Sequence, residues 1–211
     1  ELDLVLPRRP DNPDMRESAS LWLFEDNGAF AFPRMGIEAV GAQWDAHRFD
    51  VNVAFPGARV LRESGTGPTL EPLDAQGRPV TLGAGPLRFD CDTPFRRWRA
   101  TFNGSATDSD VAQQVRNAMD PARRSDIMLQ VEMTMAAPAW AQDNTPDALA
   151  GMSERERADA GFMGIGYRCE QLFRAEGTLQ IDGAVREFRG TGLRIHRQSE
   201  RPLGGFRGHC W

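Results

Sequence analysis

The chain has no lysine, few cysteines and no long apolar run. All 25 basic residues are arginines, and 30 acidic residues bring the net charge to −5. An acidic chain disfavours broad nucleic-acid binding, so none is predicted. GC-rich codon usage accounts for the arginine bias; the alternative is that some arginines hold anionic groups through their planar fork. No run approaches the roughly 18 apolar residues of a membrane helix, so no membrane span is predicted.

Cysteine spacing excludes a disulfide framework. Cys91, Cys169 and Cys210 are far apart and odd in number, which suits a reducing compartment. The sequence begins without a basic segment followed by an apolar one, which predicts a cytoplasmic location, although the missing initiator Met leaves the true start open. A zinc site built from Cys91, Cys169, His196 and His209 would need ligands from distant strands to converge. We therefore predict no metal and no cofactor.

Short alternating segments separated by turns dominate the chain from residue 18 onward. Leu21–Phe24 and Ala29–Phe32 flank an Asn-Gly turn, which predicts a hairpin. Ile37–Gln43 is predicted as a third strand. His47–Phe55 follows with clear period-2 alternation, which places Phe49 on one face with the other apolar residues. These segments predict an antiparallel sheet.

Strands also dominate the second half of the chain. Leu87–Cys91 and Trp98–Phe102 are predicted to pair, and Asn103-Gly104 to end the second of them. Asp126–Ala137 alternates as a strand, and Tyr167–Asp182 is the cleanest alternating segment. A glycine directly after Asp182 predicts a hairpin with the strand that follows.

Helix is expected in only a few places. Thr107–Arg124 has helical character with Ser109-Asp110 as a cap, or is a long surface loop. Pro138–Ala160 is predicted as a loop with one helical turn at Asp147–Leu149 and another at Glu154–Ala158. A connection of this length in a β-domain is often a functional lid.

About ten strands with little helix predict an all-β fold, either an antiparallel up-and-down barrel or a strongly curved sandwich. We expect residues 1–17 to be an extended arm and residues 18–201 to form one β-domain. Residues 202–211 would be the start of a second β-domain or a closing strand.

Two segments resemble a known family. Gly85–Ala106 and the motif FRGTGLRIHRQ, which begins at Phe188, are similar to lipocalin-like proteins related to carotenoid 1,2-hydratase, including hydroxyneurosporene-synthase-like and AttH-like proteins. Members often carry a GxGxxDHxWG-type signature. Gly190, Gly192 and His196 match its glycines and histidine.

The match to the signature is partial. Ile195 stands at its acidic position, and Arg197-Gln198-Ser199 follows the histidine. A second partial match, Gly208-His209-Cys210-Trp211, lies a few residues later. The resemblance implies a lipocalin-like barrel that is the first of two in tandem, so that a C-terminal half, or a homodimer, would complete the molecule.

A lipocalin-like barrel would accept a hydrophobic, isoprenoid- or lipid-like small molecule at its mouth. Arg194 and four aromatic residues are the predicted ligand contacts, with core filling as the alternative for the aromatics: Trp22, Trp98, Tyr167 and Phe173. For hydration of a double bond, an acid and a base are needed. His196 is the first candidate, His209 the second, and Glu170 could supply the acid if it faces inward.

Three hypotheses follow. The chain is an enzyme that adds water to, eliminates it from, or isomerises a lipophilic substrate; or a non-catalytic carrier; or a structural half of a two-barrel protein. An acid–histidine pair facing the interior favours the enzyme, and a wholly apolar cavity favours the carrier.

Overall fold

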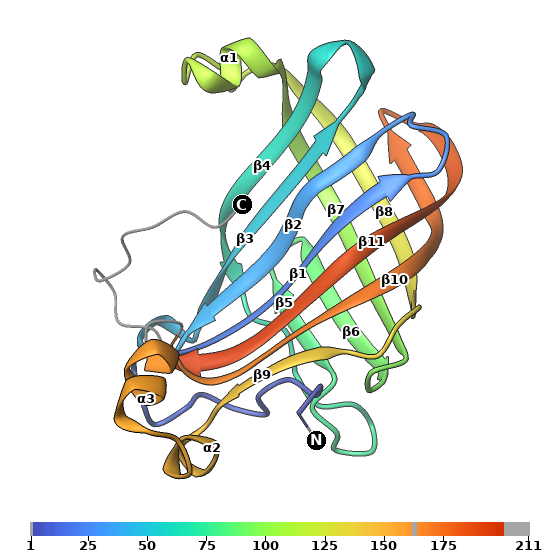
Figure 1. Cartoon of the computed structure of the whole chain (residues 1–211). Coiled ribbons are helices and arrows are strands. Elements are labelled where there is room, and N and C mark those ends of the chain that lie inside the picture. Colours follow the sequence, from blue (N-terminus) through green and yellow to red (C-terminus); the bar gives the residue numbers. More distant parts are fainter. Residues whose placement is uncertain (1, 162–163, 201–211) are drawn as a thin grey trace.

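Antiparallel strands form one sheet that closes on itself as a barrel (Figure 1). The computed structural model describes residues 2–161 and 164–200. The strands are β1 Met15–Glu25, β2 Ala31–Val40, β3 Ala46–Ala54, β4 Arg59–Pro68, β5 Thr81–Ala84, β6 Leu87–Thr93, β7 Arg97–Asp110, β8 Arg124–Met135, β9 Trp140–Asn144, β10 Ile165–Ile181 and β11 Ala184–Glu200. The α-helices are α1 Val111–Val115, α2 Pro146–Ala150 and α3 Glu154–Gly161.

Eight of these strands make the ring, in the order β1, β2, β3, β4, β7, β8, β10, β11 and back to β1. Each ring strand therefore pairs with the ring strands before and after it in the chain, which is the up-and-down arrangement. The predicted all-β barrel is confirmed, and the sandwich alternative is not needed. Closure leaves the ring without the unpaired edges of an open sheet.

The β5–β6 hairpin fills a gap in this ring. Strand β4 pairs with β7 only along one short stretch, from Arg59 opposite Asp110 to Arg62 opposite Thr107. The first half of β7 pairs instead with β6, from Leu87 opposite Phe102 onward. The hairpin thus occupies the place beside β7 that β4 leaves free, and β9 is a further addition alongside β10.

Side chains fill the barrel interior. An eight-stranded barrel is just wide enough for its inward side chains to pack, or to hold one small ligand. The largest fully buried apolar side chains come from the ring strands and β6: Trp98, Phe32, Phe89, Phe102, Phe173, Leu21, Leu23, Met35, Ile37, Leu61 and Leu87. This packed middle separates the two ends of the barrel.

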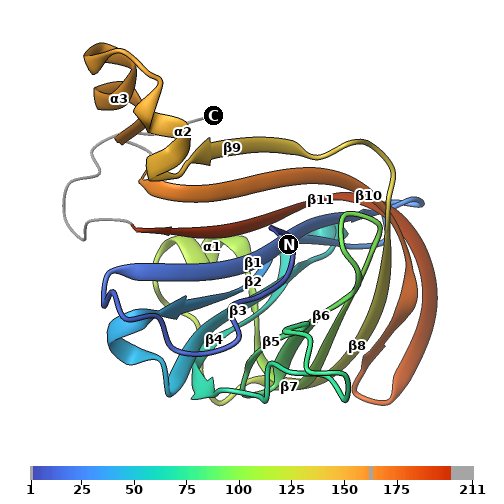
Figure 2. The ribbon, with the colours of Figure 1, turned by 90° about the horizontal axis from the view of Figure 1, so that it is seen from below.

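The two ends differ in what covers them (Figures 1 and 2). The tips of the β1–β2, β3–β4 and β10–β11 hairpins surround one end, which we call the open end. At the other, which we call the closed end, the N-terminal residues 2–6 lie across the barrel. There the Val5 amide donates to the Pro79 carbonyl oxygen at 3.0 Å. Asp3 and Val5 are buried.

Several strand predictions are confirmed, and two are wrong. Parts of the predicted strands Ala29–Phe32 and Ile37–Gln43 belong to the single strand β2, which has a register shift between Ala31 and Arg34, and Gly41–Gln43 forms a 3-10 turn instead. Asn103-Gly104 does not end β7, which continues to Asp110 because β8 pairs with it as far as Thr107 and β4 pairs with it from Thr107 to Asp110.

The structure contains helices in the segments where helical turns are predicted, with different lengths. Helix α1 begins where predicted, and Asp110 forms a capping box with Gln113, but the helix spans only five residues of the predicted segment. The predicted loop Pro138–Ala160 contains β9 as well as α2 and α3 near the two expected turns. Within the described residues, the helices are too short and polar to cross a membrane.

Candidate functional site

Strands β10 and β11 carry a row of polar side chains into the barrel at the closed end. Cys169 lies opposite His196, and Gln171 lies opposite Arg194 in the pairing of the two strands. Successive inward positions of a strand are two residues apart, so each pair falls on the interior face. All four side chains are buried. Alternation thus places a thiol, an amide, a guanidinium and an imidazole side by side.

Asp3, from the N-terminal segment, connects this row to the rest of the barrel. Its Oδ2 accepts hydrogen bonds from the Phe95 amide at 2.6 Å and from the Trp98 indole at 2.9 Å. Its Oδ1 accepts one from Arg194 Nη2 at 2.7 Å. Both members of the Asp3–Arg194 ion pair are fully buried. Such a pair is stable only when its remaining polar atoms are also satisfied.

His196 lies between two carboxylates. Its Nε2 is 3.2 Å from Glu17 Oε1, and its Nδ1 is 3.7 Å from Asp3 Oδ1, beyond hydrogen-bonding distance. Glu17 is itself held in place, because its two carboxylate oxygens accept from the Leu6 amide at 3.0 and 2.9 Å. Gln198 Nε2 donates to Glu17 Oε1 at 2.8 Å. The histidine ring is thus fixed by groups from three segments of the chain.

Charges in this cluster shift the pKa values of its members. Burial acts to raise the pKa of Asp3, but His196, Arg194 and the two hydrogen-bond donors together lower it to about 2. Burial acts to lower the pKa of His196, but the nearby carboxylates of Asp3 and Glu17 raise it above its ordinary value. The cluster therefore favours an ionised Asp3 beside a protonated His196.

Arg194 is incompletely satisfied. Its guanidinium lies 4.5 Å from the centre of the Trp98 ring, a cation–π arrangement. Its Nη2 also donates to Gln171 Oε1 at 3.3 Å. Among the described residues, its Nε and Nη1 have no hydrogen-bond partner, and neither has His196 Nδ1. Unpaired buried polar atoms are costly, so three of them in one cluster need a partner such as a water molecule or an ion.

The thiol and phenol groups nearby are not activated. Burial raises the pKa of the Cys169 thiol, and it raises the pKa of Tyr167 to about 12. Cys91, also buried, has a pKa raised to about 12 by burial. A nucleophilic cysteine requires a lowered pKa, so neither thiol is prepared for covalent catalysis by itself.

Several of the predicted site residues do come together. Trp98 contacts both other residues, with its ring 5.5 Å from the His196 ring and 4.5 Å from the Arg194 guanidinium. Tyr167 and Phe173 also face inward and are buried. A side chain at Gly192 would clash with the Phe173 ring, since a Cβ there would be 2.4 Å from it. The glycine in the family-like motif thus makes room for an aromatic core residue.

Two predicted site residues face the wrong way. Trp22 was expected to line the interior, but it lies on the outer face and is 43% exposed, because Leu21 and Leu23 take the inward positions of β1. Glu170 also points outward, since its neighbours Cys169 and Gln171 face in, and it forms a partly buried ion pair with Arg168. His209 lies outside the described residues.

Asp3 and Glu17 were missed. Both belong to the segment predicted as an arm. Glu17 could have been found, because it has the same strand phase as Ala19 and Leu21, so alternation places its carboxylate inside. No local pattern marks Asp3, whose partners lie 92 to 191 residues away along the chain.

The open end holds a pocket of different character. It has a volume of about 520 Å³ and lies among the three hairpin tips. Its lining consists mainly of apolar residues with two arginines and one aspartate: Ala29, Phe30, Phe55, Pro56, Arg59, Leu179, Ile181, Asp182, Ala184, Val185 and Arg186. Phe30 stacks edge-to-face on Phe188 at 5.1 Å, which forms part of a buried apolar floor. The volume is within the range of small-molecule pockets.

Comparison with known proteins identifies the fold. The structure is similar to the crystal structure of a candidate AttH protein from Nitrosomonas europaea, with a TM-score of 0.53 and 11% sequence identity. The similarity covers 96% of this chain and 59% of that chain, so this chain spans well under two thirds of its length. At this identity the likeness establishes the barrel fold alone. No family model and no curated protein matches the sequence.

Proposed function

We propose that the barrel binds a hydrophobic small molecule, isoprenoid- or lipid-like, in the pocket at its open end. The observation that carries the proposal is the apolar pocket itself, whose lining combines buried Phe30 and Leu179 with rim residues such as Phe55 and Val185. Because the barrel middle is filled by side chains, the ligand would lie against the buried floor rather than reach the closed end.

Titration with retinol, an isoprenoid whose fluorescence rises in apolar surroundings, tests this proposal. We expect saturable binding of one molecule per chain. Val185→Arg would place a charge in the pocket and should weaken binding about tenfold, the equivalent of about 1.4 kcal/mol. Leu73, 41% exposed in the β4–β5 connection, supplies the control. Leu73→Arg makes the same chemical change outside the pocket and should bind retinol as the wild type does.

Two results would overturn the proposal. One is the absence of saturable retinol binding, provided that a fluorescent long-chain fatty acid also fails to bind. The other is equal affinity for the wild type and the Val185→Arg variant. Native mass spectrometry of lipids that co-purify with the wild-type chain would then give an independent view of the ligand class.

Acid–base catalysis at His196 is a second candidate function. The observation in its favour is the position of the ring between Glu17 and Asp3, an acid–histidine arrangement that faces the barrel interior. A substrate would have to displace residues 2–6, because they cover the cluster. If this function holds, His196→Gln should abolish turnover of a lipophilic alkene or alcohol and leave retinol binding at the open end unchanged. Loss of both would assign His196 to structure.

We further propose that the chain is related to the carotenoid-hydratase-like and AttH-like group. The shared fold with the Nitrosomonas europaea protein supports this proposal, as does the match of Gly190, Gly192 and His196 to the family signature. That protein is longer, so a second barrel, or a second copy of this chain, would complete the arrangement. A cytoplasmic location remains part of this proposal. Size-exclusion chromatography with light scattering would show whether the chain dimerises.

A further inference from the structure

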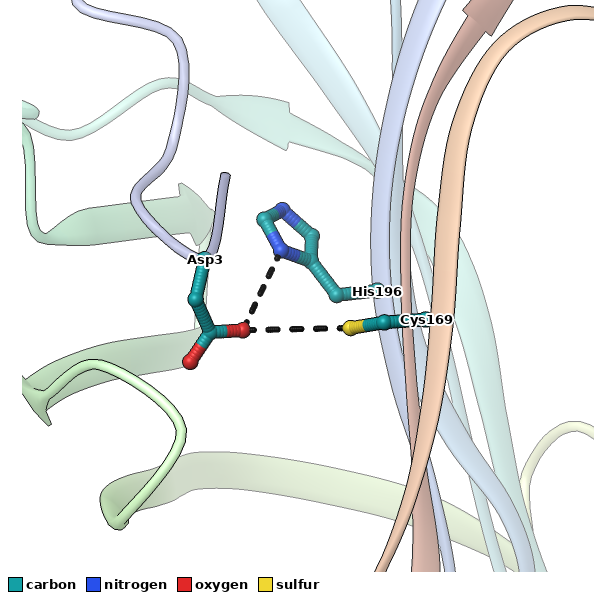
Figure 3. A group of neighbouring side chains, drawn as sticks. All are labelled: Asp3, Cys169 and His196. Atoms are coloured by element: carbon teal, nitrogen blue, oxygen red, sulfur yellow. Dashed lines mark hydrogen bonds and ion pairs between the residues drawn. The ribbon is translucent and has the colours of Figure 1, made fainter. Parts of the chain in front are cut away.

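Three metal-ligating side chains converge at the closed end (Figure 3). Asp3 comes from the N-terminal segment, Cys169 from β10 and His196 from β11. One oxygen of Asp3, the sulfur of Cys169 and Nδ1 of His196 all lie within 4.8 Å of one another. Asp3 Oδ1 is 3.7 Å from His196 Nδ1 and 3.9 Å from Cys169 Sγ. Figure 3 shows the three groups pointing toward one another.

The histidine has the orientation of a ligand. Its Nδ1 faces Asp3 and Cys169, is completely buried, and has no hydrogen-bond partner among the described residues. Its other ring nitrogen, Nε2, lies 3.2 Å from the Glu17 carboxylate. Metal-bound histidines almost always donate their second ring N–H to a carboxylate, a backbone carbonyl or a water, which fixes the ring and its tautomer. A metal ion at Nδ1 would displace the proton that the metal-free cluster favours, and it would bond an atom that has no hydrogen-bond partner among the described residues.

The spacing and donor types fit a zinc ion. Ligand bonds of about 2.0–2.3 Å in tetrahedral geometry place neighbouring donors roughly 3.3–3.7 Å apart. The Asp3 oxygen is 3.7 Å from the nitrogen and 3.9 Å from the sulfur, a few tenths of an ångström longer than in a zinc site, and the nitrogen and sulfur lie within 4.8 Å of each other. Thiolate, imidazole and carboxylate together are a donor set typical of Zn²⁺.

A divalent ion can lie close to the Arg194 guanidinium because the charges of the whole cluster then balance. The carboxylates of Asp3 and Glu17 and a Cys169 thiolate carry three negative charges, and Arg194 with a divalent cation carries three positive ones. Arg194 donates to Asp3 Oδ1 at 2.7 Å, and a carboxylate oxygen has a second lone pair that can bind a metal. Asp3 Oδ2 is already held by Trp98 and the Phe95 amide.

We propose that Asp3, Cys169 and His196 bind a zinc ion that fastens the N-terminal segment to the closed end of the barrel. Glu17 is the positioning residue that orients His196, and the fourth coordination position is left for a water molecule. This site lies at the opposite end from the proposed ligand pocket, so either can fail without the other. A His196 Nδ1 committed to a metal could not act as a general base, so the same test bears on the second candidate function.

Titration of the metal-free full-length protein with Co²⁺ tests the site, because Co²⁺ replaces Zn²⁺ and is coloured. We expect one equivalent to bind, with a sulfur-to-cobalt charge-transfer band in the near ultraviolet and intense visible bands of four-coordinate Co²⁺. Cys169→Ser should remove the charge-transfer band. Cys91→Ser, a matched change at the other buried cysteine of the described chain, should keep it. Glu17→Gln should lower the affinity by about 10- to 100-fold.

X-ray absorption of the zinc-loaded wild type keeps the test independent of any variant that fails to fold. One sulfur and two protein nitrogen or oxygen ligands per zinc are expected. The proposal is overturned if Co²⁺ gives only the weak spectrum of the hexaaquo ion. It is also overturned if the charge-transfer band survives Cys169→Ser, is lost in folded Cys91→Ser, or if the absorption data show no sulfur ligand.

Discussion

The two ends of this barrel bury different kinds of side chain: charged groups at the closed end and apolar groups at the open end. At the closed end, Asp3, Glu17, Arg194 and His196 bring charged groups into a space without solvent. At the open end, aromatic and aliphatic side chains such as Phe30 and Leu179 form the floor of an accessible pocket. Buried charges constrain one another strongly, whereas apolar contacts are tolerant of shape. We therefore expect stability to be most sensitive to single changes at the closed end, and the open end carries the pocket that we propose binds a ligand.

Among the changes that test this comparison, removal of the Asp3 carboxylate should lower the free energy of unfolding most. Asp3→Ala leaves the Arg194 guanidinium buried without its carboxylate and leaves the Trp98 indole without its acceptor. Loss of one partner of a buried ion pair costs about 3–5 kcal/mol, so the free energy of unfolding should fall by that amount in urea denaturation. Asp11→Ala changes an exposed aspartate of the same segment and should have almost no effect. Equal, small effects would mean that the segment does not close the barrel.

Acid should weaken the closed end through Asp3 in particular. Its pKa is about 2 in the folded protein, below the ordinary 3.8, so its ionised form stabilises the fold above pH 4. That contribution, about 2 kcal/mol, is lost as the pH falls toward 2. In metal-free protein, the unfolding free energy of the wild type should therefore fall more steeply between pH 4 and pH 2 than that of Asp3→Asn. Parallel pH profiles would contradict an ionised, hydrogen-bonded Asp3.

The rim of the open end should be the least sensitive region. Val185 is 65% exposed, so Val185→Arg should change the free energy of unfolding by less than about 0.5 kcal/mol, although it enters the proposed ligand pocket. Thermal unfolding monitored by circular dichroism would measure the difference. A loss of several kcal/mol would show that the rim is part of the packed core, and the contrast between the two ends would fail.

The sequence predicts what is encoded locally. Strands and hairpins were recognised because alternation and Asn-Gly or Asp-Gly turns act over a few residues. Arg194 and His196 are two residues apart on β11, so alternation puts them on one face. It failed at Leu21–Phe24, where all four residues are apolar and either face could have been buried. In β1, Glu17 and Ala19 face inward, and because inward positions are two residues apart, Leu21 and Leu23 also face inward.

The other half of the site depends on contacts that no local pattern carries. Asp3 belongs to no strand, and its partners lie on β7, β10 and β11, which are brought together only by the closed ring. The prediction that residues 1–17 form an arm therefore missed a carboxylate that belongs to the barrel interior. The sequence offers only cysteines and histidines as candidate metal ligands, because the convergence of Asp3 with Cys169 and His196 exists only in three dimensions.

Paramagnetic NMR with a spin-labelled fatty acid, a nitroxide-carrying stearate, would test the difference between the two ends most directly. If the open end accepts hydrophobic ligands, the label should broaden the amide signals of Phe30, Phe55 and Val185, which line the pocket. The amides of Val5 and Leu6, hydrogen-bonded to Pro79 and Glu17 at the closed end, should stay sharp. Broadening of Val5 and Leu6 with sharp signals at the pocket would contradict the account.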